Sequence, residues 1–343
     1  MIRLYSTDFS NGEIIFEVGR LAGQANGALT VRWGDTVVLV TATAGEPRPG
    51  IDFFPLTVDL EERRYASGRI PGGFFRREGR PSTEGILTAR SIDRPLRPMF
   101  PEGYRNDVQI VAMPLSSDDE HQVDVMSICG ASAALIISDI PFSIPVGAVR
   151  VGYANGEFII NPTMSQMVES QLDMVLAGTA DSVLMIEVGA KELPEDLMME
   201  AIRRGHAAIQ GVCALQLQMM AEVGKPKKAG VLHAVDPAVK ARVIELTQKP
   251  LEELVAAELS REERQERETE LRTSAKAQLE SEGLDVVDFG EAFEDVLKQV
   301  MRRRILDTGI RIDGRDTRTI RPLSAEVGLL PRTHGSALFS RGE

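Results

Sequence analysis

The pattern of apolar residues changes at residues 224–230, and this change limits what the chain can fold into more than any other feature. Before this segment, short β-branched runs are bounded by turn residues, as in strands joined by hairpins. After it, apolar residues recur every three to four positions, as in amphipathic helices. The segment itself, Gly-Lys-Pro-Lys-Lys-Ala-Gly, has the composition of a linker. The sequence therefore predicts an α+β region followed by a helical one.

Strands in the α+β region are predicted at 28–44, 108–116, 148–162 and 173–189. The third of these runs contains Asn155-Gly156, a dipeptide typical of two-residue hairpin turns. Residues 27–35 and 335–343 share a pattern, in which a glycine and a short apolar strand lead to a Gly-acid turn. We interpret this as an internal duplication, with coincidence as the alternative. Because the second copy stops at the turn, we expect the chain to be a fragment of a longer protein.

Helices are predicted on both sides of the linker. Residues 124–138 are expected to form a buried helix, in which the small residues 130–132 allow close backbone approach. A long helix is expected to start at Pro194 and to keep one apolar face as far as Leu215. Beyond the linker, Ser260 begins a capping box with Glu263, and a further helix is expected to stop near Gly309. The acidic run 252–270 is expected to be a solvated helix face rather than a binding site.

Charge is distributed unevenly along the chain. The formal net charge is −12, which argues against indiscriminate nucleic-acid binding. Residues 63–97 nevertheless contain nine arginines against three acidic residues, and the first lysine of the chain is Lys191. Arginine presents a flat fork that pairs with phosphate and stacks on bases. The stretch therefore indicates phosphate or RNA, with a solvated basic face as the alternative.

The loop Gly-Gly-Phe-Phe-Arg-Arg-Glu-Gly-Arg-Pro, residues 72–81, combines aromatic and cationic groups. From the residues alone, Phe74 and Phe75 are equally compatible with core anchors and with an exposed platform on which bases stack. Glycines 72 and 73 are expected to let the backbone turn.

Other candidate positions predict structure rather than chemistry. Residues 118–121, Asp-Asp-Glu-His, have metal-ligand side chains, but neighbours rarely converge on one ion, so an exposed turn is expected. His206 is expected to be structural. Cys129 and Cys213 lie in apolar surroundings and are expected to be buried thiols of a reduced, cytoplasmic protein. No apolar run approaches the length of a membrane span, and the N-terminus lacks the pattern of a signal peptide.

Several motifs together resemble the N-terminal part of bacterial polynucleotide phosphorylases, and they occur in the family's order. The matching stretches are 51–58 (Ile-Asp-Phe-Phe-Pro-Leu-Thr-Val), 68–82 around the loop, 92–98 (Ile-Asp-Arg-Pro-Leu-Arg-Pro), 129–135 (Cys-Gly-Ala-Ser-Ala-Ala-Leu), 311–315 (Arg-Ile-Asp-Gly-Arg) and 330–339 (Leu-Pro-Arg-Thr-His-Gly-Ser-Ala-Leu-Phe).

The resemblance implies a domain organisation and an activity. It implies a first RNase PH-like domain at 1–225, an all-helical domain at 226–306 and the start of a second RNase PH-like domain at 307–343. It implies a phosphorolytic 3′→5′ exoribonuclease that degrades single-stranded RNA and mRNA with inorganic phosphate to nucleoside diphosphates. It further implies a cytoplasmic homotrimeric ring, Mg²⁺ or Mn²⁺ bound outside this chain, no membrane, and association with a helicase and an endonuclease of RNA degradation.

The resemblance also assigns RNA-binding residues. In the family, the Phe-Phe-Arg-Arg loop lines the channel of the ring and grips single-stranded RNA, which favours the stacking role for at least one phenylalanine. The candidate RNA-binding residues are Phe74, Phe75, Arg76, Arg77, Arg80, Arg94 and Arg97. For the last two, a reach toward the active site and pairing with Asp93 and Glu84 are equally open.

No catalytic or metal-binding residue is expected in this chain. Aligned on the segment at Cys129, the family's phosphate-binding serines correspond to residues 121–124, where Asp124 would repel phosphate. The family's metal and acid–base residues correspond to Met167, Asp173 and Val175, of which one carboxylate is a poor Mg²⁺ site. The chain alone is therefore predicted to be inactive. A non-catalytic RNA-binding ring component is the alternative function, whereas a stand-alone RNase PH-type trimming enzyme would have no place for the helical domain.

Overall fold

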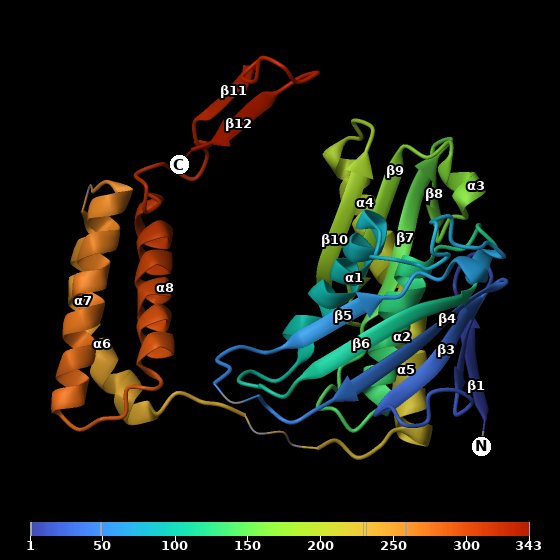
Figure 1. Cartoon of the computed structure of the whole chain (residues 1–343), viewed down its shortest axis with the longest axis horizontal. Coiled ribbons are helices and arrows are strands. Elements are labelled where there is room, and N and C mark those ends of the chain that lie inside the picture. The colour runs from blue at the N-terminus through green and yellow to red at the C-terminus, as the bar shows by residue number, and fades with distance from the viewer. Residues whose placement is uncertain (1, 49, 229, 231, 258, 343) are drawn as a thin grey trace. The chain divides into compact units, whose positions relative to one another are not determined.

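The computed structural model describes residues 2–48, 50–228, 230, 232–257 and 259–342. It divides after His233 into two compact units (Figure 1). The three-domain division at 225/226 and 306/307 stays a prediction. Within the described ranges, no helix combines the length and the apolar character that crossing a membrane requires.

The described residues of the first unit form two sheets. The larger has the order β1-β2-β3-β4-β6-β5, in which only the β5–β6 pair is parallel. The smaller is antiparallel throughout, in the order β10-β9-β7-β8. The strands are β1 (Arg3–Asp8), β2 (Glu13–Val18), β3 (Gly27–Trp33), β4 (Thr36–Ala44), β5 (Leu56–Leu60), β6 (Val108–Ser116), β7 (Gly147–Ala154), β8 (Glu157–Ile160), β9 (Leu172–Gly178) and β10 (Val183–Ala190).

Helix α2 (Val123–Ile137) contacts both sheets and forms the centre of the unit (Figure 1). Its residues 125–137 are all buried, which explains why the sequence is apolar on every side of this helix. A Cβ on Gly130 would lie 2.7 Å from a Val31 methyl group, so the predicted close approach is confirmed. Burial raises the pKa of the Cys129 thiol to about 12 and that of the Cys213 thiol to about 11, and both thiols are unpaired.

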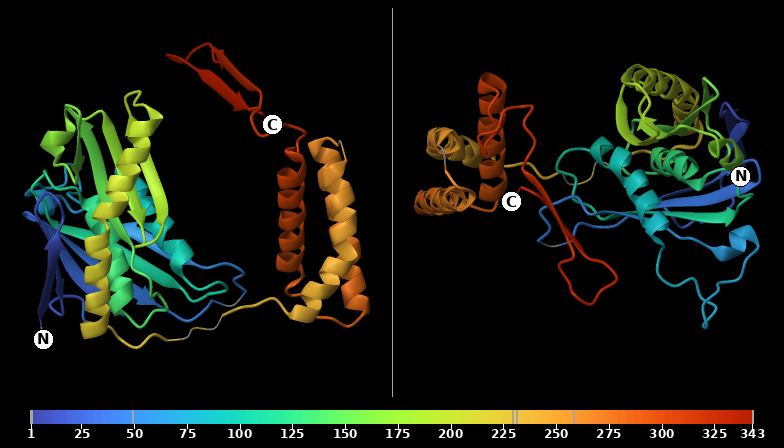
Figure 2. Two further views of the ribbon diagram at one scale, coloured as in Figure 1. Left: turned by 180° about the vertical axis from the view of Figure 1, so that it is seen from behind. Right: turned by 90° about the horizontal axis from the view of Figure 1, so that it is seen from above.

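The helices of the first unit surround this core (Figure 2). They are the short 3-10 helix η1 (Arg64–Ser67), α1 (Thr83–Leu96), the 3-10 turn η2 (Arg97–Met99), α3 (Met164–Met167), α4 (Glu195–Ala208) and α5 (Gln210–Val223). All four predicted strand regions form strands, and the predicted fold class α+β is confirmed.

The single long helix predicted from Pro194 is wrong, because it is divided at Ile209 into α4 and α5. The Gln210 side chain donates to the carbonyls of His206 and Ala180 at this point, 3.1 and 2.9 Å away. Helix α4 packs on β7, β8 and β9, and α5 packs mainly on α2 and β1. The break is confined to Ile209, and an apolar face alone does not reveal it.

In the second unit, the described residues form the helices α6 (Pro237–Ala256), α7 (Arg261–Ser281) and α8 (Phe289–Thr308), followed by a hairpin of β11 (Leu323–Val327) and β12 (Ala337–Arg341). The predicted capping box of Ser260 and Glu263 starts α7, and Gly309 ends α8 in the left-handed region with φ 70°. In the β11–β12 pairing, residues 337–341 of the second copy pair as residues 29–33 of the first copy do in β2–β3, which favours the interpretation as an internal duplication. Glu343, the last residue of the second copy, and Ala229 of the linker lie outside the described residues.

Candidate nucleic-acid interface

The loop between η1 and α1 projects from the first unit and is tied down at both ends (Figure 2). At its return, the Glu78 carboxylate accepts a hydrogen bond from the Arg64 N–H, at 2.9 Å. Before α1, the Glu62 carboxylate accepts from the Ser82 N–H, also at 2.9 Å. Ser82 then caps α1 by accepting from the Gly85 N–H. These local bonds hold the base of the loop while its tip stays free.

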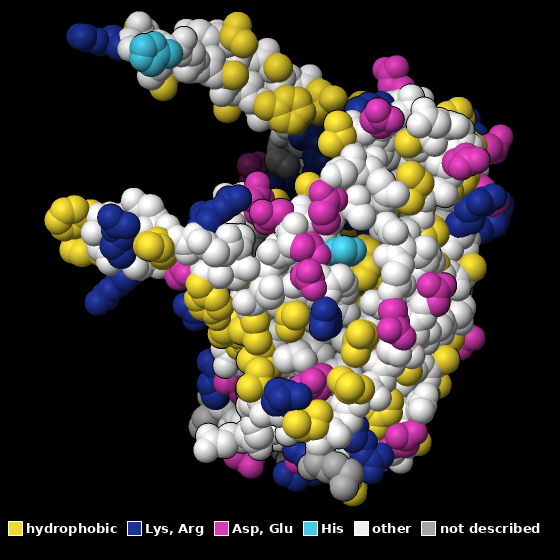
Figure 3. Space-filling model, turned by 90° about the vertical axis from the view of Figure 1, so that its right-hand side faces the viewer, with side chains coloured by type: hydrophobic (Ala, Val, Ile, Leu, Met, Phe, Trp, Pro, Cys, Tyr) yellow, Lys and Arg dark blue, Asp and Glu magenta, His cyan; other side chains and the backbone are white. Residues whose placement is uncertain are grey.

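Phe74 and Phe75 lie at the tip and are 93% and 81% exposed. Their rings meet edge to face, with centroids 5.4 Å apart. Of the two alternatives, core anchor and exposed platform, the structure therefore shows the exposed arrangement. Figure 3 shows the loop as a narrow arm with hydrophobic side chains at its end and basic side chains behind them.

The tip is a four-residue turn from Gly73 to Arg76, with Phe74 and Phe75 as its central residues. Arg76 has φ 54°, and its N–H donates to the Gly73 carbonyl at 2.9 Å. Neither Gly72 nor Gly73 has a positive φ, and a Cβ at either position would meet no atom within 4 Å. Gly73 thus takes part in the turn as its first residue, and the expectation that the two glycines let the backbone approach the RNA strand stays a prediction.

The arginines of the loop carry uncompensated charge. Arg76, Arg77 and Arg80 are exposed, and they form no ion pair with any residue that the structure describes. Five of the seven predicted RNA-binding residues therefore lie together on one loop, with two bare rings and three available guanidinium groups.

Arg94 and Arg97 lie on the other end of α1 and at the start of η2, and both are engaged within the fold. Arg97 binds the Asp93 carboxylate at 2.8 and 3.1 Å and donates to the carbonyls of Phe54 and Leu56, each at 3.1 Å. Arg94 pairs with Glu187 of β10 rather than with Asp93 or Glu84. The predicted pairing with Asp93 is therefore found for Arg97, Arg94 has a different partner, and a reach of either arginine toward an active site stays a prediction.

The turn at residues 118–121 is built around one carboxylate and is half-buried rather than fully exposed. Asp118 accepts hydrogen bonds from the Thr36 hydroxyl at 2.9 Å and from the backbone N–H groups of Asp35, Glu120 and His121, and it lies 2.6 Å from His121 Nδ1. Burial by itself raises the pKa of Asp118, but these hydrogen bonds outweigh it and hold the pKa well below its usual range. The Asp118 side chain thus connects the start of β4 to the turn that precedes α2, which is a structural role.

We expect Asp118→Asn to lower the free energy of unfolding by about 1.5–3 kcal/mol, because the amide loses charge-assisted bonds from several donors. As the pH falls, the Asp118 carboxylate is protonated in the unfolded chain before it is protonated in the folded chain, because its pKa is lower in the folded chain. This stability is therefore complete above about pH 4 and declines as the pH falls toward the folded pKa. Urea unfolding at several pH values measures it. Asp119→Asn removes the same charge from an exposed neighbour and should cost under about 1 kcal/mol; equal losses for both variants would contradict the assignment.

Asp124 and Asp173, which the alignment places at the family's phosphate-binding and metal-binding positions, both lie beside one arginine. Arg150 of β7 lies 2.7 Å from Asp124 Oδ2 in the first turn of α2 and 3.4 Å from Asp173 Oδ1 on β9. Its guanidinium is largely buried, with 15% of the side chain exposed. The Arg150 guanidinium thus already supplies the positive charge that a metal ion would bring to these two carboxylates. Val175 is buried in the core, with 5% of its surface exposed.

The remaining titratable candidates have structural contacts. His206 Nε2 lies 3.1 Å from the Thr179 carbonyl oxygen, as expected for a structural histidine. Among the residues that the structure describes, no three or more His, Cys, Asp or Glu side chains are grouped to hold a metal ion.

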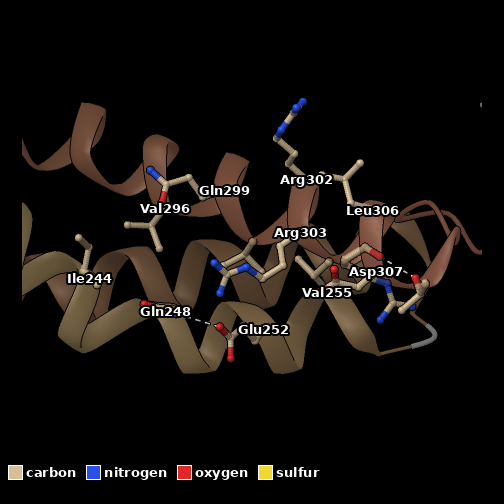
Figure 4. Close-up of a pocket in the computed structure, with 13 residues that line it drawn as sticks. Ile244, Gln248, Glu252, Val255, Val296, Gln299, Arg302, Arg303, Leu306 and Asp307 are labelled. Atoms are coloured by element: carbon tan, nitrogen blue, oxygen red, sulfur yellow. Dashed lines mark hydrogen bonds between the residues drawn. The ribbon is translucent and has the colours of Figure 1, made fainter.

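The helical unit has a hollow between α6 and α8 (Figure 4). Its floor is apolar, and Arg302, Arg303 and Arg304 line it together with Glu252 and Asp307. Carboxylates thus partly balance the arginines, and no aromatic ring lines the hollow. The loop at 72–81 therefore remains the stronger candidate for binding a nucleic acid.

Three family models match the chain. Residues 12–141 match "3′ exoribonuclease family, domain 1", residues 145–208 match domain 2 of the same family, and residues 238–316 match "Polyribonucleotide nucleotidyltransferase, RNA binding domain". The match in the first unit covers the candidate loop and the Asp124–Arg150–Asp173 cluster.

Curated relatives match over the whole chain. The polyribonucleotide nucleotidyltransferase of Roseiflexus sp. (strain RS-1) is 48% identical over 348 residues, which cover 100% of this chain and 47% of the relative. That of Geobacillus kaustophilus is 46% identical over 346 residues, or 99% of this chain and 47% of the relative. The chain thus spans about half the length of the curated relatives it matches. Among solved structures, rice Rrp46 has a similar fold, with a TM-score of 0.51 at 14% identity over 63% of this chain and 98% of that one.

Proposed function

The chain belongs to the polyribonucleotide nucleotidyltransferase family, and we propose that it is the RNA-binding, N-terminal portion of a phosphorolytic 3′→5′ exoribonuclease. In this reaction, a phosphate oxygen attacks the 3′-terminal phosphodiester of single-stranded RNA. The terminal nucleotide leaves as a nucleoside diphosphate, and the shortened RNA keeps a free 3′ hydroxyl. The proposed role of this portion is to hold the strand and to build the ring.

The observation that carries this proposal is the exposed loop. An aromatic face stacks on any base without regard to sequence and contributes about 1–3 kcal/mol per base. Phe74 and Phe75 offer two such faces, and the three unpaired arginines behind them suit the phosphates between the bases. An enzyme that shortens one RNA strand step by step needs contacts that do not depend on base identity, because successive bases of the strand pass the same site. The description of the model that matches residues 238–316 also supports RNA as the partner.

The wider assembly belongs to the same proposal. Three copies of the loop around a threefold axis would form a basic, aromatic collar in an otherwise acidic protein. Mg²⁺ or Mn²⁺ would assist the attack of phosphate by neutralising charge on the phosphodiester. The residues of this chain do not fit such an ion, because Arg150 already pairs with Asp124 and Asp173. We place the protein in cytoplasmic mRNA degradation, with a helicase and an endonuclease as partners.

These 343 residues alone are proposed to bind RNA without cleaving it. Asp124 lies in the first turn of α2, where a bound phosphate would otherwise be attracted by the helix N-terminus. Val175 can neither carry a proton nor hold a charge. The second candidate function is a non-catalytic RNA-binding ring component. The pairing of Arg150 with Asp124 and Asp173 favours it, and it describes the proposed role of this portion by itself.

The test is an assay of nucleoside diphosphate release from oligo(A) with inorganic phosphate and Mg²⁺, with a full-length relative as the positive control. RNA binding is scored in the same samples. We expect the relative to release diphosphate and this chain to bind RNA without releasing any. Release by this chain, abolished by Asp173→Asn or Asp124→Asn, would overturn the inactive assignment.

A further inference from the structure

A hollow lies at the base of the loop, behind the two phenylalanines. It is lined by residues at η1 and on both sides of the loop tip: Arg63, Tyr65, Arg69, Ile70, Pro71, Arg76, Arg77, Glu78 and Gly79. Its volume of about 590 Å³ lies within the range of small-molecule binding pockets. The hollow thus has room for a group the size of a nucleotide.

Tyr65 presents an aromatic ring to this hollow from a fixed support. The residue is 55% exposed, and its hydroxyl contacts the Met113 sulfur at 3.8 Å. The Ser117 N–H at the end of β6 donates to the Ala66 carbonyl at 2.8 Å, which ties η1 to the sheet. The Arg64 N–H bond to Glu78 ties the same turn to the return of the loop. An exposed ring on a rigid turn loses little freedom when a flat group stacks on it.

The hollow is strongly cationic. Four of its lining residues are arginines and one is a glutamate. Arg63 pairs with Glu61 at 3.0 Å and Arg69 with Asp119 at 3.5 Å, but both are surface pairs that yield readily to another anion. Arg76 and Arg77 line the hollow and also belong to the tip, so the positive charge is continuous from the rings to Tyr65.

We propose that this hollow holds one further nucleotide of the single strand gripped by Phe74 and Phe75. The base stacks on Tyr65, and its phosphate lies between Arg69 and the pair Arg76 and Arg77. A ring and guanidinium groups side by side suit a nucleotide better than an acidic peptide, which offers charge without a flat face. The inference rests on the proposed function, and it extends the footprint of the RNA from the tip of the loop to its base.

The test compares the affinity of this chain and of its Tyr65 variants for a short oligo(A) strand, by fluorescence anisotropy. Tyr65→Ala should weaken binding by on the order of tenfold, because one stacked base is lost. Tyr65→Phe keeps the ring and should bind as the unchanged chain does. Equal affinity of all three proteins would overturn the inference while leaving the proposed function intact. Absence of RNA binding by the unchanged chain would instead remove the proposed function itself.

A second variant reports on stacking directly. The chain has a single tryptophan, Trp33, which is buried, so Tyr65→Trp introduces the one exposed indole. Oligo(A) should quench its fluorescence as a base stacks on it, whereas polyglutamate should not. No quenching at RNA concentrations that saturate binding, or equal displacement of RNA by polyglutamate, would contradict a nucleotide site at Tyr65. Thermal unfolding of each variant shows whether the fold is kept.

Discussion

Replacing Phe74 and Phe75 together with alanine is expected to weaken the binding of single-stranded oligo(A) by about 5- to 150-fold for each base that loses its ring. This follows from stacking contributions of about 1–3 kcal/mol per base. The rings have almost no contact with the rest of the fold, since they are 93% and 81% exposed. Their loss should therefore leave the free energy of unfolding unchanged. The measurement is the dissociation constant by fluorescence anisotropy, with urea unfolding of the same samples.

Conservative variants separate stacking from simple hydrophobic contact. Tyrosine at both positions keeps the π faces and should keep most of the affinity, whereas leucine keeps apolar surface but no face and should behave like alanine. Tight binding by the leucine variant would show that the loop contacts RNA through apolar burial alone. Unchanged binding by the alanine variant would remove the two rings from the interface.

Replacing Arg76, Arg77 and Arg80 with glutamine is expected to reduce the salt dependence of RNA binding. For single strands, each neutralised phosphate contributes about 0.7 to the slope of log K against log salt, so three contacts contribute about 2. The affinity at low salt should fall accordingly, and the difference from the unchanged chain should shrink as salt rises. Titrations between about 50 and 200 mM salt give the slope.

A matched control changes the net charge equally but elsewhere. Arg3, Arg20 and Arg203 are exposed arginines that pair with carboxylates outside the loop. Glutamine at these three positions should leave the slope nearly unchanged. If both triple variants lowered the slope by the same amount, the binding would depend on overall charge and not on the loop.

Sequence signals that act within a few residues predicted their structures well. Asn155 and Gly156 have φ of 54° and 83°, both positive as a type I′ hairpin turn requires. The capping box of Ser260 and the left-handed Gly309 mark helix ends for equally local reasons. The candidate loop could also be identified, because its aromatic and cationic residues are contiguous.

Features that depend on partners distant in the sequence could not be predicted in this way. Arg97 is held by the carbonyls of Phe54 and Leu56, some forty residues earlier. Arg150 pairs with Asp124 and Asp173, which are brought together only by the packing of α2 on the smaller sheet. Tyr65 gives no signal as a lone tyrosine, and it becomes a candidate only because η1 and the return of the loop enclose a hollow.

The central claim is that this chain grips single-stranded RNA through the loop at residues 72–81. The most direct measurement is the binding of the unchanged chain to fluorescent oligo(A), alone and annealed to oligo(U), at several salt concentrations. We predict binding of the single strand that weakens as salt rises, and much weaker binding of the duplex, whose bases are already stacked. Equal binding of strand and duplex, or no binding of the single strand at low salt, would contradict the account.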